Sequence, residues 1–140
     1  MTNVWKERVL IALCLFAGTM DATSGALLMF WPEGALRMMS VPPVAAEALV
    51  FNRFIGAFVF SVGCLYLFSL LPVIVMRRWH WVWGVLAATA WLRSVICVFT
   101  SVAIASGALS PAWWSVPVTD GVLAVVQIWI LLKGWVRRHA

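Results

Sequence analysis

Residues 81–105 read WVWGVLAATAWLRSVICVFTSVAIA, an apolar run in which Arg93 is the only charged side chain. About 20 consecutive apolar residues are enough for an α-helix to cross the ~30 Å hydrocarbon core of a bilayer. The sequence therefore predicts a transmembrane helix over 81–105.

Three further apolar stretches of similar character accompany this one, over residues 9–31, 48–76 and 112–132. The whole chain of 140 residues is 64% hydrophobic and only 11% charged, which lies far outside the composition of soluble proteins. We therefore predict an all-α fold, with residues 1–140 forming a single domain that is an integral membrane four-helix bundle.

The basic residues predict the orientation of this bundle. Only Arg37 falls in the loops on one side, whereas the other side collects Lys6, Arg8, Arg77, Arg78, Lys133, Arg137 and Arg138. Cytoplasmic loops carry the excess of Lys and Arg in multi-pass proteins, so both termini and the middle loop are expected in the cytoplasm. We expect a multi-pass protein of the bacterial inner membrane. Since topology accounts for the net charge of +5, no nucleic-acid partner is expected.

Tryptophans and small residues indicate how the helices sit and pack. Trp79 and Trp81 lie beside the basic middle loop, as aromatic rings at headgroup depth do. Small residues recur at helical spacing in the first two spans, at Gly18, Ala22, Ala26, Gly56 and Gly63. Such stripes let helix backbones approach closely, but they leave open whether the neighbouring helix belongs to the same chain.

The segment 32–47 is the only sizeable element on the other side. It is amphipathic and is interrupted by Pro42 and Pro43, which cannot donate backbone hydrogen bonds. It is interpreted as a connector resting on the interface, with a lid over the bundle as the alternative.

Each of the four spans contains one charged residue: Asp21, Arg53, Arg93 or Asp120. An ionised group at mid-bilayer costs at least ~2.5–3.5 kcal/mol, so such residues face the bundle interior and pair, or line a functional path. Counting ~1.5 Å per residue from the predicted ends places all four about 18–22 Å above the cytoplasmic edge. We therefore expect one neutral layer of two acids and two bases.

The pairing within this layer stays open at the level of sequence. Asp120 can pair with Arg93 and Asp21 with Arg53, or the pairs can cross. Asn52 and Gln127 can supply further hydrogen bonds, Gln127 from the helical face that carries Asp120. The favoured interpretation is a polar clasp that fixes helix register. The alternatives are a pocket for the polar head of a lipophilic ligand and a proton relay, against which the fixed arginine countercharges argue.

Reactive constellations are absent from the sequence. Both histidines, His80 and His139, lie outside the spans, so no axial haem ligand is available, and no HExxH, Walker loop or nucleophile elbow occurs. The three cysteines have no metal-site spacing. We expect no cofactor, no metal and no catalysis by this chain alone.

The layout resembles the DoxX-like group of small four-helix bacterial membrane proteins. The matching features are a first helix ending near Pro32, an Arg-x-x-Gly at Arg53 to Gly56 followed by Gly63, Arg93 in the third helix and Asp120 in the fourth. The resemblance implies a four-helix membrane bundle and, in some members, association with redox membrane complexes. It implies no defined reaction.

Two functional hypotheses follow from the sequence. In the first, the chain is a non-catalytic accessory or scaffold subunit that packs against other membrane protein subunits or itself, surrounded by membrane lipids. In the second, it binds a lipophilic small molecule such as a quinone or a lipid, whose polar head contacts the Asp/Arg layer. We favour the first, because the loops are minimal and small-residue stripes mark helix contacts.

Overall fold

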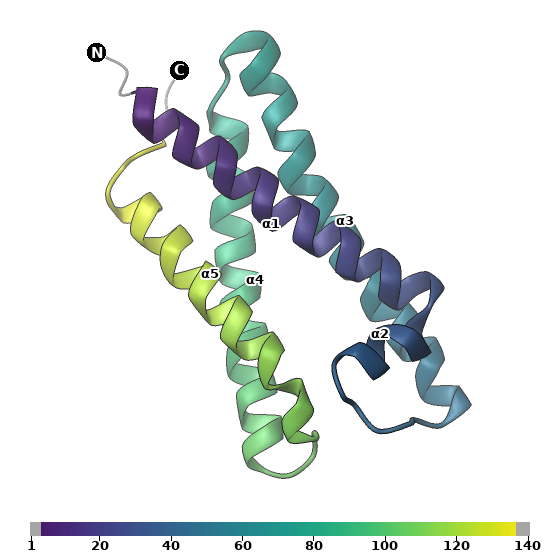
Figure 1. The fold of residues 1–140 in the computed structure, drawn as a ribbon. Helices are drawn as coiled ribbons and strands as arrows, with labels where there is room; N and C mark the ends of the chain where they lie inside the picture. Colours follow the sequence, from purple (N-terminus) through teal and green to yellow (C-terminus); the bar gives the residue numbers. More distant parts are fainter. Residues whose placement is uncertain (1–3, 137–140) are drawn as a thin grey trace.

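The computed structural model describes residues 4–136, and every regular element in that part of the chain is a helix (Figure 1). The elements in chain order are α1 (Val4–Phe30), α2 (Pro32–Met38), α3 (Ala46–Met76), α4 (His80–Ala105), the 3-10 helix η1 (Pro111–Trp114) and α5 (Ser115–Leu132). The predicted all-α fold is confirmed.

Four helical segments are long and apolar enough to cross a membrane, which indicates a multi-pass membrane protein. They are α1, α3, α4 and the continuous segment formed by η1 and α5, with 27, 31, 26 and 22 residues. The predicted spans are confirmed, but α1 begins at Val4, well before the expected residue 9. Lys6, Glu7 and Arg8 are good helix formers, so the helix extends beyond its apolar part.

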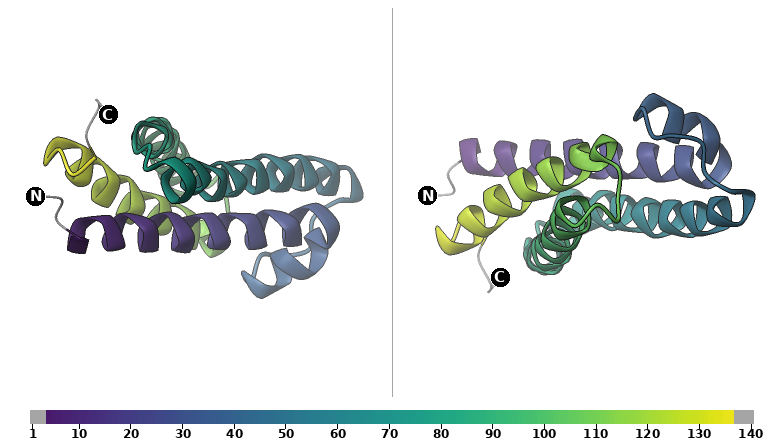
Figure 2. Two further views of the ribbon diagram at one scale, coloured as in Figure 1. Left: turned by 90° about the horizontal axis from the view of Figure 1, so that it is seen from above. Right: turned by 90° about the horizontal axis from the view of Figure 1, so that it is seen from below.

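The bundle consists of two helical hairpins. The most extensive contacts join α1 to α3 and α4 to α5. Figure 2 shows α1 and α3 side by side over most of their length, and Figure 1 shows the two hairpins diverging away from the turn that joins α3 to α4. The end with this turn also contains the start of α1 and the end of α5.

Glycines bring the backbones of α1 and α3 into direct contact. A Cβ atom on Gly25 would lie 2.3 Å from the backbone nitrogen of Phe60, and one on Gly63 would lie 2.3 Å from that of Ala22. Real Cβ atoms do not approach so closely, so only glycine fits at these crossings. The predicted close packing is confirmed, and the neighbouring helix belongs to the same chain.

The hydrophobic core occupies the half of the bundle near the α3–α4 turn, where all four spans still meet. Its fully or nearly fully buried side chains are Leu10, Cys14, Ala17, Tyr66, Leu70, Val73, Val82, Leu86, Leu123, Ile130 and Val136. In the other half each hairpin buries its residues mainly against its own partner helix. The core therefore ends near mid-bundle, where the charged residues begin.

The short helix α2 packs on the first hairpin only. Ala35 and Leu36 are buried, and the contacts of α2 are mainly with α1 and α3. This placement agrees with a connector rather than a lid over the whole bundle.

Candidate functional site

Arg93 occupies the centre of α4 and points into the bundle. The buried residues Leu86, Thr89, Arg93 and Thr100 recur at helical spacing, so they share the face of α4 that meets the other spans. Arg93 is only 5% exposed. A buried guanidinium requires acceptors for its fixed fork of N–H groups, and the neighbouring helices supply them.

Two carboxylates bracket this guanidinium from different helices. The Nη2 atom of Arg93 donates to Oδ2 of Asp21 on α1, and Nη1 donates to Oδ1 of Asp120 on α5. The side chains of Asp21 and Asp120 are 7% and 14% exposed. One arginine therefore binds both predicted acids, so the two alternative pairings foreseen from sequence are replaced by a shared cation.

Neutral groups extend the network to α3. The Nε atom of Arg93 donates to the hydroxyl of Tyr66 at 3.3 Å, and the same hydroxyl accepts from Nε2 of Gln127. Oγ1 of Thr89 lies 3.3 Å from Oε1 of Gln127, to which it donates. Tyr66 and Gln127 have no exposed surface. All four membrane-spanning segments thus contribute to one set of hydrogen bonds.

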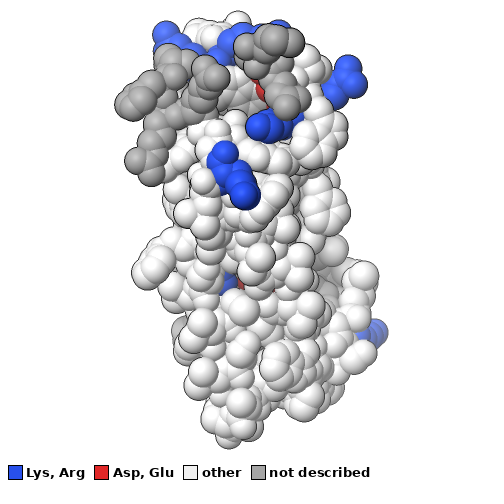
Figure 3. Space-filling model, turned by 90° about the vertical axis from the view of Figure 1, so that its left-hand side faces the viewer, with Lys and Arg blue, Asp and Glu red and all other residues white. Residues whose placement is uncertain are grey.

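We call this set the charged cluster: Asp21, Tyr66, Thr89, Arg93, Asp120 and Gln127. In Figure 3 a small spot of basic and acidic atoms is visible midway along the molecule, apart from the Lys and Arg residues that gather mainly at the upper end. Among the residues that the structure describes, every buried side-chain nitrogen and oxygen has a hydrogen-bond partner. The chain itself therefore satisfies the buried polar atoms of the cluster, while the Asp120 side chain keeps 14% of its surface exposed.

Two predicted members lie outside the charged cluster. Arg53 is exposed, and it forms no ion pair with any residue in the described range 4–136. Asn52 is buried, but its side-chain amide donates to the backbone oxygen of Ala48 at 2.9 Å. The expected neutral layer is not formed.

The pairing of α3 with α1 explains the position of Arg53. A Cβ on Gly56 would meet the backbone nitrogen of Met29, so Arg53, almost one turn earlier in α3, lies close to the end of α1. Asp21 instead lies near Gly63, because a Cβ on Gly63 would meet the backbone nitrogen of Ala22. The two residues expected in one layer are therefore far apart along the first hairpin.

The composition of the charged cluster limits its chemistry. Two carboxylates and one guanidinium give a formal charge of −1 when all three are ionised, and each carboxylate is bound by the guanidinium of Arg93. No group of three or more metal-ligating side chains occurs among residues 4–136. The arrangement is suited to holding helices together.

Tyr66 and Thr89 are members that the sequence analysis missed. Tyr66 is the only tyrosine in the chain and lies deep within a span, away from the interface where such rings gather. Thr89 precedes Arg93 by one helical turn on the same face. Both signals were present in the sequence, although each is also compatible with ordinary packing.

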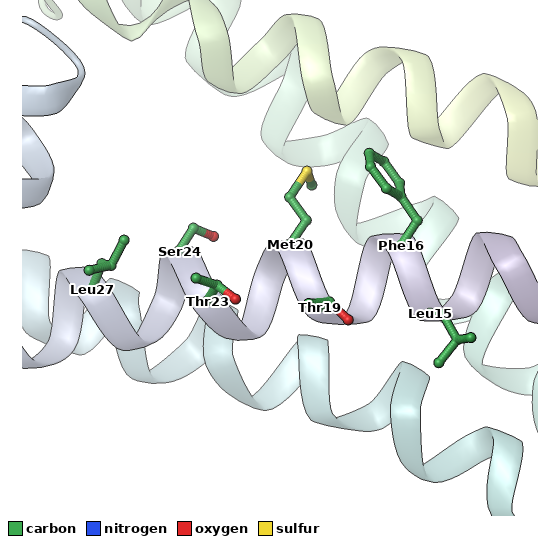
Figure 4. A pocket seen from close by; sticks show the side chains of 7 residues that line it. All are labelled: Leu15, Phe16, Thr19, Met20, Thr23, Ser24 and Leu27. Carbon is green, nitrogen blue, oxygen red and sulfur yellow. The ribbon is translucent and has the colours of Figure 1, made fainter.

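A surface groove runs along α1 beside the charged cluster (Figure 4). Its volume is about 620 Å³, and its lining residues are Leu15, Phe16, Thr19, Met20, Thr23, Ser24 and Leu27. Phe16 and Met20 point toward α5 in Figure 4. The Ser24 hydroxyl donates to the backbone oxygen of Asp21 at 3.2 Å, so the groove and the cluster share a turn of α1.

Comparison with known proteins adds no relative. No model of a protein family matches the chain, and no curated protein or solved structure matches it. The resemblance to the DoxX-like group stays a prediction.

Proposed function

We propose that this chain is a non-catalytic integral membrane protein that serves as an accessory or scaffold subunit of a larger assembly in the bacterial inner membrane, with both termini in the cytoplasm. The observation that supports the proposal is that every side-chain hydrogen bond of Arg93 goes to a side chain on a neighbouring helix. An active site or a ligand site needs polar groups that are free to engage a substrate.

The charged cluster acts as a clasp between the two hairpins. Asp21 and Tyr66 belong to the first hairpin, and Arg93 and Asp120 to the second. Because the hairpins diverge beyond this level, the ion pairs are the last strong contacts between them. Loss of one partner of a buried pair costs ~3–5 kcal/mol, whereas an intact pair costs far less to bury. The cluster therefore fixes how the hairpins dock.

The groove on α1 is the face that we assign to a neighbouring subunit. Thr19 and Thr23 are exposed there, one turn apart. Small and hydroxyl-bearing residues at this spacing are typical of helix–helix contacts inside membranes, and a face that meets only lipid does not require them. The exposed faces of α4 and α5 differ, since Val98 and Val125 there are purely apolar.

Site-specific photo-crosslinking tests this assignment in native membranes. A photoreactive residue at Thr23 is expected to give one discrete adduct, and the same residue at Val125 is expected to give only lipid adducts. Both positions are exposed, so neither substitution disturbs the core. A free 15.5 kDa species in blue-native electrophoresis, with equal crosslinking from both positions, would contradict the proposal.

A lipophilic small molecule is the second candidate occupant of the groove. Its support is the apolar lining of the groove together with the 14% exposure of the Asp120 side chain, which belongs to the neighbouring charged cluster and not to the groove lining. Native mass spectrometry of gently purified protein separates the candidates. A retained small-molecule mass that is lost in Thr23→Phe would favour the ligand over a subunit.

A further inference from the structure

A second recess lies at the end of the bundle where α3 turns into α4. Its volume is about 350 Å³, and its lining residues are Leu71, Pro72, Val75, Met76, Arg78 and Trp81. The apolar wall comes from the last turns of α3, whose side chains Leu71, Val75 and Met76 are 56%, 72% and 61% exposed. Apolar surface of this extent at the end of a span faces lipid.

Two adjacent arginines at this turn have different surroundings. Arg77 adopts the left-handed conformation with φ of 57°, and its Nη1 atom donates to Oε2 of Glu7 on α1 at 3.2 Å. The backbone N–H of Arg78 donates to the carbonyl of Pro72 at 3.1 Å, and its side chain lines the recess. Because Arg77 adopts the left-handed conformation, the side chains of Arg77 and Arg78 point in different directions.

The charge of Arg78 is not neutralised within residues 4–136, because no acidic side chain there pairs with it. Glu7 is the only acidic side chain at this end and already binds Arg77, since the other four acids of the chain lie in the charged cluster or near the opposite end. Lys6, Arg8 and Lys133 add positive charge here. The recess therefore lies in a positive field.

We propose that this recess binds an anionic phospholipid. The guanidinium of Arg78 holds the phosphate, and the start of an acyl chain lies against Leu71, Val75 and Met76. Trp81, which is 55% exposed beside the recess, contacts the glycerol region, where amphipathic indole rings prefer to lie. A guanidinium beside the apolar wall of the recess is complementary to an amphiphile that has a negatively charged head and an apolar chain.

Charge favours an anionic lipid over a zwitterionic one. A choline or ethanolamine headgroup brings a cation to an end of the bundle where the single acid is already paired. A free phosphate would use Arg78 but would leave the apolar wall uncovered. Basic groups near a membrane surface favour anionic lipids by about 1 kcal/mol each, which corresponds to about a fivefold preference.

The test compares retained lipids in two variants that lose the same charge. The full chain is reconstituted in nanodiscs of phosphatidylcholine and phosphatidylglycerol and is analysed by native mass spectrometry. Arg78→Gln is expected to lower the ratio of retained phosphatidylglycerol to phosphatidylcholine about fivefold. Arg77→Gln is expected to leave this ratio close to that of the wild type, and Arg78→Lys is expected to keep most of it.

Three results would overturn the proposal. In the first, Arg77→Gln and Arg78→Gln lower the ratio equally, which would mean that only the total charge matters. In the second, neither variant changes it. In the third, inorganic phosphate raises the unfolding temperature of the protein in detergent as much as phosphatidylglycerol does, and only when Arg78 is present. That result would assign the recess to a free anion. Because Arg78 is exposed, loss of its charge leaves the core intact.

Discussion

The two hairpins are held together by different kinds of contact. In the first hairpin the backbones of α1 and α3 touch at glycines, as where a Cβ on Gly25 would meet the backbone of Phe60. In the second, α4 and α5 are separated by side chains, and a Cβ on Gly121 would meet only the sulfur of Cys97, at 3.1 Å. The contact in the first hairpin requires that no Cβ atom is present at the crossing. The contact in the second hairpin is made by side chains, which can change conformation.

This difference predicts where each hairpin is fragile. Backbone atoms cannot move aside without displacing a whole helix, whereas a side chain can change its rotamer. The first hairpin should therefore resist any added volume at its crossings, and the second should absorb small changes. Both hairpins contribute to the charged cluster, as they do to the hydrophobic core.

Removal of the shared cation is expected to have the largest effect. Arg93→Leu leaves Asp21 and Asp120 facing each other without a countercharge, so it should lower the free energy of unfolding by ~3–5 kcal/mol. Thermal unfolding in mild detergent, followed by size-exclusion chromatography, measures this loss.

Two variants control that experiment. Arg53→Leu removes the same charge from an exposed site without an ion pair among the described residues, so its unfolding temperature should stay near that of the wild type. Asp120→Asn brings the formal charge of the cluster to zero, so it should cost clearly less than Arg93→Leu. Equal unfolding temperatures for Arg93→Leu and Arg53→Leu would show that the charged cluster does not hold the two hairpins together.

A glycine-to-alanine series compares the hairpins directly. Gly25→Ala is expected to destabilise the protein by ~1–3 kcal/mol, because the new methyl group meets backbone atoms. Gly121→Ala is expected to be close to neutral. Gly84→Ala on α4 meets nothing within 4 Å, so the better helix propensity of alanine should stabilise the protein by up to ~1 kcal/mol. Chemical or thermal unfolding in detergent ranks the three variants, and a different order would refute the contrast between the hairpins.

The ion pair between Glu7 and Arg77 should have the smallest effect. The Arg77 side chain is 79% exposed, so water and salt screen the pair strongly. Glu7→Gln is expected to cost at most ~1 kcal/mol, and less as ionic strength rises. A larger loss that persists in high salt would mean that this pair, rather than the core, holds α1 against the α3–α4 turn.

The four spans could be predicted from sequence because solubility in lipid depends on runs of apolar residues, which a linear reading detects. The lateral arrangement could not be predicted, because it depends on which face of each helix meets which neighbour. Arg53 shows the difference. Its membership of a helix long and apolar enough to span a membrane was predicted correctly, but its position relative to Asp21 depends on how α3 pairs with α1.

The charged cluster was predicted in part for the same reason. Asp21, Arg93, Asp120 and Gln127 lie near mid-span in the sequence, so their common level could be counted. The sharing of Arg93 between two carboxylates requires three helices to converge, which no sequence spacing encodes. Tyr66 joins because its long side chain reaches across from α3.

The split of charge between the hairpins has a consequence for biogenesis. The second hairpin contains both Arg93 and Asp120, so its buried charges balance before it contacts the first hairpin. The first hairpin enters the bilayer with Asp21, and its own arginine, Arg53, lies at a different level. Asp21 gains a countercharge only when the hairpins dock. Docking, rather than insertion, is therefore the step that brings a cation to Asp21, and a first hairpin without its partner carries a buried acid with no cation beside it.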